Sequence, residues 1–192
     1  MDILDELLAS PEPAVRYKVL ANILGRSPES PEVKTAQEAV RRSERVLALL
    51  LERTGDGGTL CSAYSKWQGA HWLLSILADV GYPPADVSLV PLRDQTYAWL
   101  LSEAHWKKIV TSQGRVRRCA SQEGNALYST LMLGIADERV EQLAKRLLLW
   151  QWPDGGWNCD KHPEADTSSF MESLIPLRGL ALHARLTGNA KS

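Results

Sequence analysis

A glycine that ends a helix recurs along this chain at nearly constant intervals. Helical apolar patterns lead into Gly25, Gly81, Gly134 and Gly188, which are 53 to 56 residues apart. Glycine at such a position favours the left-handed backbone that terminates a helix. After each of the first three glycines, a short polar loop leads to a second helix that ends at a pair of leucines. The sequence therefore predicts a helical hairpin of about fifty residues, present three times and followed by the first half of a fourth.

Helix is the only secondary structure whose period recurs. In residues 31–53 and again in residues 137–152, apolar residues fall at steps of three and four, which places them on one stripe of a helix. Strand-like alternation is absent from the sequence, and β-branched residues are sparse. We predict an all-α protein in which the hairpins stack side by side, as a superhelix or as a ring, because no hairpin buries its apolar face alone.

The fourth unit has no second helix to pack against. Residues 168–187 are predicted to form a first helix whose apolar face carries Leu174, Leu177, Leu180 and Leu182, yet the given sequence stops at residue 192. We expect either that residues 1–192 form one incomplete domain of a longer protein with a missing C-terminal half, or that another chain or a second copy covers this face.

The first and third units share a turn. Residues 49–61 and 147–159 are identical at seven of thirteen positions, which include Asp-Gly-Gly and a cysteine three residues beyond it. Glycines supply the positive φ that a tight stop after a long helix needs. We therefore interpret Asp154 as a hydrogen-bonding residue of a turn or helix N-terminus rather than as a catalytic acid.

Gln151, Gly155 and Trp157 follow a known spacing after a leucine-rich helix. The pattern resembles the QW repeat of squalene and hopene cyclases, which is related to the repeat of protein prenyltransferase β subunits. The resemblance implies an α/α toroid of paired helices whose inner ring lines an isoprenoid cavity. The resemblance covers most of the chain as a repeat but only residues 147–159 as a specific motif. The sequence departs from the motif at Arg146, where the family has an aromatic residue. We interpret Gln151 and Trp157 as structural, an amide that satisfies helix-end groups and an indole that covers it.

The catalytic motifs of these families are missing from the sequence. It contains neither the Asp-x-Asp-Asp of class II cyclases nor the Asp-Asp-x-x-Asp of class I enzymes. Prenyltransferase β subunits bind zinc through Asp-x-Cys and a later His, whereas the order here is Asn158, Cys159, Asp160. The resemblance thus implies a terpene cyclase-like or prenyltransferase-like protein and leaves open whether it is an enzyme.

The first helices of units two to four are predicted to line the cavity, because they are unusually polar and aromatic. Indole faces stabilise cations and carboxylates transfer protons, so an isoprenoid pocket is one interpretation. Core aromatics and hydrogen-bonded residues at helix ends are the other. On the first interpretation, the proposed catalytic residues are Glu123, Glu172 and His71, and the ligand-binding residues are Trp67, Trp72, Gln122, Asn125, Tyr128 and Ser169. The neighbouring Arg115, Arg117 and Arg118 suit either a diphosphate or a solvated loop.

Cys159, Asp160, His162 and Asp166 are the densest group of metal-ligating residue types. The sequence has no Cys-x-x-Cys or His-x-x-x-His, so we expect helix-capping roles here and no metal. No cofactor is indicated. Cys119 and Gln122 have the spacing of the internal thioester of complement-type domains, but Arg118, Ala120 and Ser121 replace the surrounding Gly and Glu.

Charge and composition narrow the function classes. The 22 basic and 23 acidic residues form no basic block, which argues against binding to nucleic acid or to an anionic membrane surface. No run of 18 apolar residues could span a membrane, and an acidic start with three scattered cysteines favours a cytoplasmic protein. Two alternatives remain: a non-catalytic interaction module with an exposed face along Leu174, Leu177 and Leu182, and a glycan-processing α/α barrel.

Overall fold

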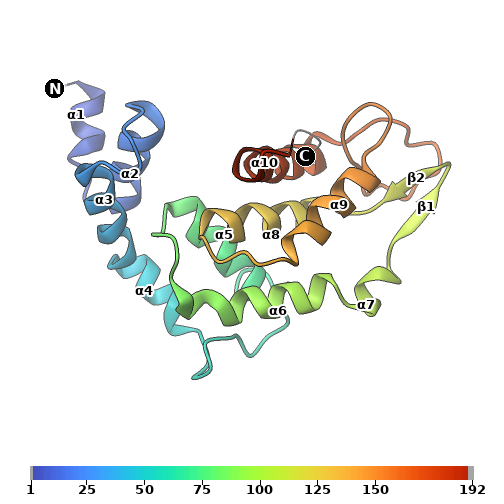
Figure 1. Ribbon diagram of the computed structural model, residues 1–192, viewed down its shortest axis with the longest axis horizontal. Helices are drawn as coiled ribbons and strands as arrows, with labels where there is room; N and C mark the ends of the chain where they lie inside the picture. Colours follow the sequence, from blue (N-terminus) through green and yellow to red (C-terminus); the bar gives the residue numbers. More distant parts are fainter. Residues whose placement is uncertain (1, 190–192) are drawn as a thin grey trace.

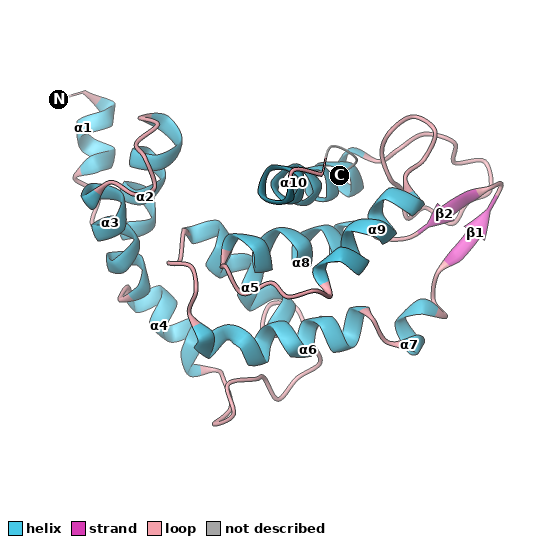
Figure 2. Cartoon of the chain, viewed as in Figure 1, coloured by secondary structure: helices cyan, strands magenta, loops and turns pink. Residues whose placement is uncertain are grey.

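The computed structural model describes residues 2–189, and these are mostly helical, with 56% of residues in helices and a single two-stranded sheet (Figures 1 and 2). The all-α prediction is confirmed at this level, although the short sheet was not expected. The elements in chain order are α1 (Ile3–Leu8), α2 (Pro13–Lys18), the π-helical η1 (Val19–Ile23), α3 (Pro31–Arg41), α4 (Glu44–Leu51), α5 (Ala70–Val80), the 3-10 turn η2 (Val87–Leu89), α6 (Val90–Leu100), α7 (Glu103–Trp106), β1 (Val110–Ser112), β2 (Arg115–Arg117), α8 (Ser121–Met132), α9 (Val140–Trp150) and α10 (Phe170–Thr187).

The predicted hairpin units are present. Their first helices are α2 with η1, α5, α8 and α10, and their second helices are α3 with α4, α6 and α9. All four glycines predicted to end first helices have positive φ, from 61° to 84°. Gly81 is the left-handed C-cap of α5, and Gly188 is that of α10. The glycine spacing therefore located the end of each first helix correctly.

The second helix of the first unit is broken, whereas the apolar stripe over residues 31–53 predicted one continuous helix. α3 ends at Arg41, and Ser43 is the N-cap of α4, where its hydroxyl accepts a hydrogen bond from the Val46 amide at 3.4 Å. A serine hydroxyl can accept a hydrogen bond from a nearby backbone amide in place of a helical carbonyl. Serine therefore stabilises the start of a helix more than its interior. This local competition, which the hydrophobic period does not register, divides the helix in two.

α8 lies in the middle of the molecule and packs against α5 on one side and α10 on the other (Figure 1). The contact with α10 is made close by two glycines. A Cβ at Gly124 would lie 2.7 Å from the Cα of Pro176, and a Cβ at Gly179 would lie 2.7 Å from the Gly124 carbonyl oxygen. The two helices can approach this closely only because neither position carries a side chain.

The short sheet and the loop that precedes α10 are fastened together. β1 and β2 pair antiparallel through a tight turn in which Gln113 and Gly114 both have positive φ, and Arg117 of β2 bridges to Asn158. The buried Arg117 guanidinium lies 4.6 Å from the Trp152 ring centroid and donates to the Ala165 carbonyl at 2.7 Å. Arg117 therefore holds the loop and is not a solvated loop residue.

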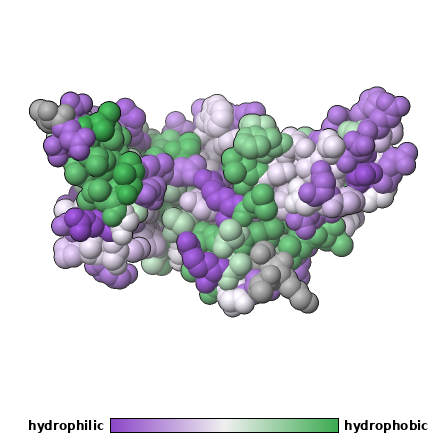
Figure 3. All heavy atoms as spheres, turned by 90° about the horizontal axis from the view of Figure 1, so that it is seen from above, coloured by the Kyte–Doolittle hydropathy of each residue, from purple (hydrophilic) through white to green (hydrophobic). Residues whose placement is uncertain are grey.

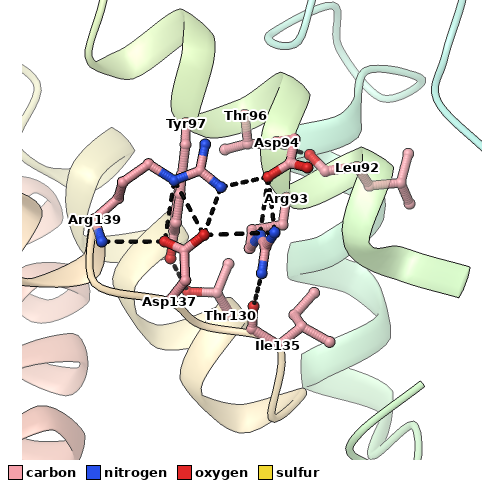
Figure 4. Close-up of polar contacts among 9 residues, drawn as sticks. All are labelled: Leu92, Arg93, Asp94, Thr96, Tyr97, Thr130, Ile135, Asp137 and Arg139. Carbon is pink, nitrogen blue, oxygen red and sulfur yellow. Dashed lines mark hydrogen bonds and ion pairs between the residues drawn. The ribbon is translucent and has the colours of Figure 1, made fainter. Parts of the chain in front are cut away.

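A network of ion pairs connects α6 with the loop between α8 and α9 (Figure 4). Arg139 donates to Asp137 at 3.0 Å and also pairs with Asp94, while Arg93 lies 3.4 Å from Asp137 and donates to the Ile135 carbonyl at 2.8 Å. Hydrogen bonds from Arg139 keep the pKa of the Asp137 carboxyl below its usual value. The second and third units are thus joined by charge as well as by apolar packing.

α10 is only partly covered. Leu180 and Leu182 are buried, whereas Leu174 and Leu177 are 54% and 49% exposed. The expectation of an exposed face along Leu174, Leu177 and Leu182 is therefore right for the first two and wrong for Leu182. Among residues 2–189, no helix combines the length and apolarity that crossing a bilayer requires.

Candidate functional site

The turn that carries the cyclase-like spacing is a structural element. The Gln151 side-chain amide donates to the Gly155 carbonyl at 2.8 Å, and the indole of the buried Trp157 donates to the Leu147 carbonyl in α9 at 2.9 Å. The Asp154 carboxylate accepts hydrogen bonds from the Ser168 amide at 2.6 Å and its hydroxyl at 2.5 Å. The structural interpretation is therefore confirmed for Asp154, and Trp157 satisfies a carbonyl near the end of α9. Gln151 differs in detail, because its amide bonds to the turn rather than to a helix-end group.

His71, predicted to be catalytic, lies inside a cluster of aromatic rings. Its centroid is 5.4 Å from that of Tyr64, 5.5 Å from that of Trp72 and 5.6 Å from that of Trp99, and its side chain is buried. Burial lowers the pKa of the imidazole to about 4. The ring is therefore neutral at pH 7 and contributes packing.

The two tryptophans predicted as pocket walls pack on each other at the edge of this cluster. Trp67 and Trp72 meet edge to face with centroids 4.5 Å apart, and the Trp72 indole donates to the Tyr64 carbonyl at 3.3 Å. The Trp67 side chain is 61% exposed. These rings form a half-buried cluster at the surface.

Glu123, the second predicted catalytic residue, is fully buried and faces α7. Its Oε1 lies 2.9 Å from His105 Nε2, whereas Oε2 has no hydrogen-bond partner among the described residues. Arg118 contacts the same imidazole and donates to the Gln122 side-chain oxygen at 2.6 Å. Glu123 and Gln122 thus connect α8 to α7 and to Arg118, which follows β2. Sequence analysis missed His105 because it lies in a four-residue helix and belongs to no motif.

Asn125 and Tyr128 lie on the side of α8 that carries a polar contact between three first helices. The Arg178 guanidinium of α10 lies 3.7 Å from the Tyr128 ring centroid, 2.8 Å from the Asp79 carboxylate of α5 and 3.5 Å from the Asn125 side-chain oxygen. Two predicted residues are thus brought together, with Arg178 and Asp79 as partners that the sequence did not indicate.

Glu172 and Ser169 stand at the start of α10. The Glu172 carboxylate accepts a hydrogen bond from the Ser121 amide at 3.0 Å, and its other oxygen lies 3.7 Å from Cys159 Sγ. The Ser169 amide donates to the Trp157 carbonyl at 2.8 Å.

Trp99 links the aromatic cluster to Glu123, because its ring centroid lies 5.6 Å from that of His71 and 4.9 Å from that of His105. The structure therefore joins His71, Trp67, Trp72, Glu123 and Gln122 in one network, whereas Asn125 with Tyr128, and Glu172 with Ser169, make other contacts.

A groove of about 510 Å³ lies at the opposite ends of the same helices. It is bounded by a first helix from each of the four units and by α3. Its lining includes Tyr17 of α2, Ala78 of α5, Leu131 and Met132 of α8, and Leu182, Arg185 and Leu186 of α10. None of the nine predicted residues lines this groove. Sequence analysis did not identify its lining, because leucine, methionine and tyrosine at helix ends are as common in a core as in a groove.

A second groove, of about 630 Å³, lies between α2, α4 and α5 and also contains none of the predicted residues. Its rim carries an ion pair between Glu12 and Arg45, whose charged atoms are 3.1 Å apart.

Comparison with family models, with curated proteins and with solved structures gives no match for this chain.

Proposed function

We propose that this chain is an α/α-toroid repeat protein, similar to terpenoid cyclases and prenyltransferases, that binds an apolar, isoprenoid-like ligand between the first helices of its units. The observation that supports the proposal most is the groove of about 510 Å³, to which all four first helices contribute. Ligand pockets typically measure about 300–1,000 Å³ and are mainly apolar. The inner-ring cavity implied by the resemblance would occupy this place.

The chemistry of the lining favours a ligand with an apolar body and an anionic or polar end. Leucines, Met132 and the half-buried Tyr17 supply the apolar walls. Two cations and two carboxylates border the groove. Lys34 pairs with Glu29 at 2.6 Å and Glu38 pairs with Arg41 and Arg42, whereas Arg185 makes no ion pair with any residue from 2 to 189. A guanidinium without a partner beside apolar walls suits a phosphate or carboxylate head group.

The proposal is one of binding, without an acid–base step. The carboxylates of Glu123 and Glu172 and the imidazole of His71 do not line the groove, so a ligand held there would not reach them. A general acid or base must lie within hydrogen-bond distance of the atom it protonates or deprotonates.

Calorimetric titration with farnesol and with farnesyl diphosphate tests this function. Leu186→Glu places a charge on the groove wall at a side chain that is 59% exposed, so it should not disturb folding. Leu149→Glu on α9, where the side chain is 72% exposed and outside the groove, is the matched control. We expect Leu186→Glu, but not Leu149→Glu, to weaken farnesol binding by about tenfold or more, because the bound hydrocarbon of farnesol would remove water from the new carboxylate. Equal affinity of the two variants, or no binding by the wild type, would contradict the proposal.

A second candidate function, self-association, is favoured by the uncovered side of α10. Phe170, Met171, Leu174 and Leu177 are between 49% and 77% exposed, and Figure 3 shows hydrophobic surface over α10 in the middle of the view. Their spacing places them on one helical stripe, the kind of face that a second copy of the chain could bury. Light scattering should then show a concentration-dependent dimer that Leu174→Glu abolishes and Leu149→Glu retains; a monomer at every concentration would exclude it.

A further inference from the structure

Two cysteines and a carboxylate meet at the N-terminal ends of α8 and α10. Cys119 directly precedes α8, Cys159 follows the Asp-Gly-Gly turn, and Glu172 lies in the first turn of α10. The two Sγ atoms and one Glu172 oxygen all lie within 4.8 Å of one another, and all three side chains are half-buried. Residues 13 to 53 positions apart in the sequence are thus gathered at one point.

The backbone around the cluster is fixed by independent contacts. The bridge between Arg117 and Asn158 places the segment that leads to Cys119 beside the segment that leads to Cys159. The Ser121 amide donates to one Glu172 oxygen at 3.0 Å, which leaves the other oxygen 3.7 Å from Cys159 Sγ. In metal sites, a hydrogen bond to the carboxylate oxygen that does not bind the metal commonly orients the other oxygen toward it.

One separation in the cluster is close to that of a tetrahedral zinc site, and the others are no more than 4.8 Å. With Zn–S bonds of about 2.3 Å and Zn–O bonds of about 2.0 Å, two sulfurs bound to one zinc ion lie about 3.8 Å apart, and a sulfur and an oxygen lie about 3.5 Å apart. The measured Sγ to Oε1 distance of 3.7 Å is close to the second value. Small side-chain rotations would therefore complete the site without movement of the helices.

The electrostatics of the cluster also favour a cation. Within residues 2–189, Glu172 makes no ion pair with a lysine, arginine or histidine. A bound divalent cation would compensate the charge of this carboxylate and of the thiolates that coordinate it.

We propose that Cys119, Cys159 and Glu172 bind one Zn²⁺ ion per chain, with the fourth tetrahedral position left to water. Three protein ligands and one exchangeable position are typical of zinc sites that are not purely structural. This site replaces the expectation of no metal around Cys159, and it excludes the other residues of that group. Asp160 and His162 are exposed, and the Asp160 carboxylate accepts a hydrogen bond from the His162 amide at 2.9 Å.

The zinc site is separate from the proposed ligand groove. Ser121 begins α8 and Met132 ends it, so at 1.5 Å per residue the two sites lie about 16 Å apart along this helix. Loss of metal binding and loss of ligand binding can therefore be observed independently.

Titration of the reduced chain with Co²⁺, whose bonds to thiolates give charge-transfer absorption, tests the proposal. We expect one Co²⁺ per chain, displaced by Zn²⁺ with loss of the absorption. Cys119→Ser and Cys159→Ser should each reduce the thiolate absorption to that of one sulfur or less, and Glu172→Gln should weaken binding by about tenfold or more. Cys61→Ser is the matched control, because Cys61 occupies the position equivalent to Cys159 in the first unit. Among residues 2–189, its sulfur has only Thr59 Oγ1 as a hydrogen-bond partner, at 3.9 Å.

A second measurement does not depend on the folding of variants. In the wild type, Zn²⁺ should protect Cys119 and Cys159 from maleimide, as read by peptide mass spectrometry, while Cys61 stays as reactive as without metal. Equal labelling of all three cysteines with and without Zn²⁺ would overturn the proposal. So would a Co²⁺ absorption that keeps its full intensity in Cys119→Ser and in Cys159→Ser, or a Cys119–Cys159 disulfide that forms in the presence of excess Zn²⁺.

Discussion

Mild acid should destabilise the packing around His71, by an amount that follows from its burial. The ordinary pKa of this imidazole is 6.5, and burial among aromatic rings lowers it to about 4 in the folded chain. The unfolded chain therefore takes up a proton first as the pH falls. The stability that comes from keeping His71 neutral is present above pH 6.5 and is lost as the pH falls from 6.5 towards 4.

The linkage relation gives the magnitude. With these two pKa values, lowering the pH from 7 to 5 removes about 2 kcal/mol from the free energy of unfolding. This is a substantial part of the roughly 5–15 kcal/mol that stabilises a typical domain. The His71 imidazole is buried, so water does not reduce this change in stability.

Urea unfolding at pH 7 and at pH 5 measures this loss. The wild type contains other titrating groups, so the comparison is with His71→Phe, which keeps a ring among Tyr64, Trp72 and Trp99 but has nothing to protonate. We expect the variant to lose about 2 kcal/mol less than the wild type between the two pH values. His162→Gln, at an exposed position, should behave as the wild type. If His71→Phe and the wild type lose the same stability, His71 is not a buried neutral imidazole and its structural assignment is wrong.

Two further substitutions test the packing of the repeat units, with thermal or urea unfolding as the measurement. Gly124→Ala should cost about 1–3 kcal/mol, because the new Cβ would meet the backbone of α10 at 2.7 Å, whereas Gly55→Ala has no atom within 4 Å of the new Cβ and should cost nothing. Trp157→Phe should cost about 1–3 kcal/mol, because the buried Leu147 carbonyl loses its indole donor. The same change at Trp106, which is 48% exposed, should have little effect, and equal effects at the two tryptophans would contradict the structural role of the turn.

The helical hairpins could be predicted from the sequence because the signals that define them are local. The backbone takes a positive φ directly after each first helix, and glycine is the residue that adopts it most readily. The ends of these helices could therefore be predicted from Gly25, Gly81, Gly134 and Gly188 without knowledge of the packing. Asp154 was likewise assigned correctly from its turn alone. The break between α3 and α4 at Ser43 was not predicted, because the apolar residues keep their helical spacing on both sides of this N-cap.

The candidate site was less predictable because it depends on how each helix is rotated and on contacts between distant segments. Glu123 stands on a predicted cavity helix, yet its carboxylate faces His105, and no periodicity of α8 alone reveals that partner. The groove lies at the other end of α8, among residues such as Met132 that are common in any core. Cys119 and Cys159 are 40 residues apart, and only the pairing of β2 with the turn brings them together.

Photolabelling with a diazirine analogue of farnesol, mapped by peptide mass spectrometry, tests the proposed function most directly because it reports where the ligand lies. Binding between the first helices predicts labels on Met132, Leu182 and Leu186, which excess farnesol suppresses. Labels confined to Trp67 and Trp72, or labels that farnesol does not suppress, would contradict it.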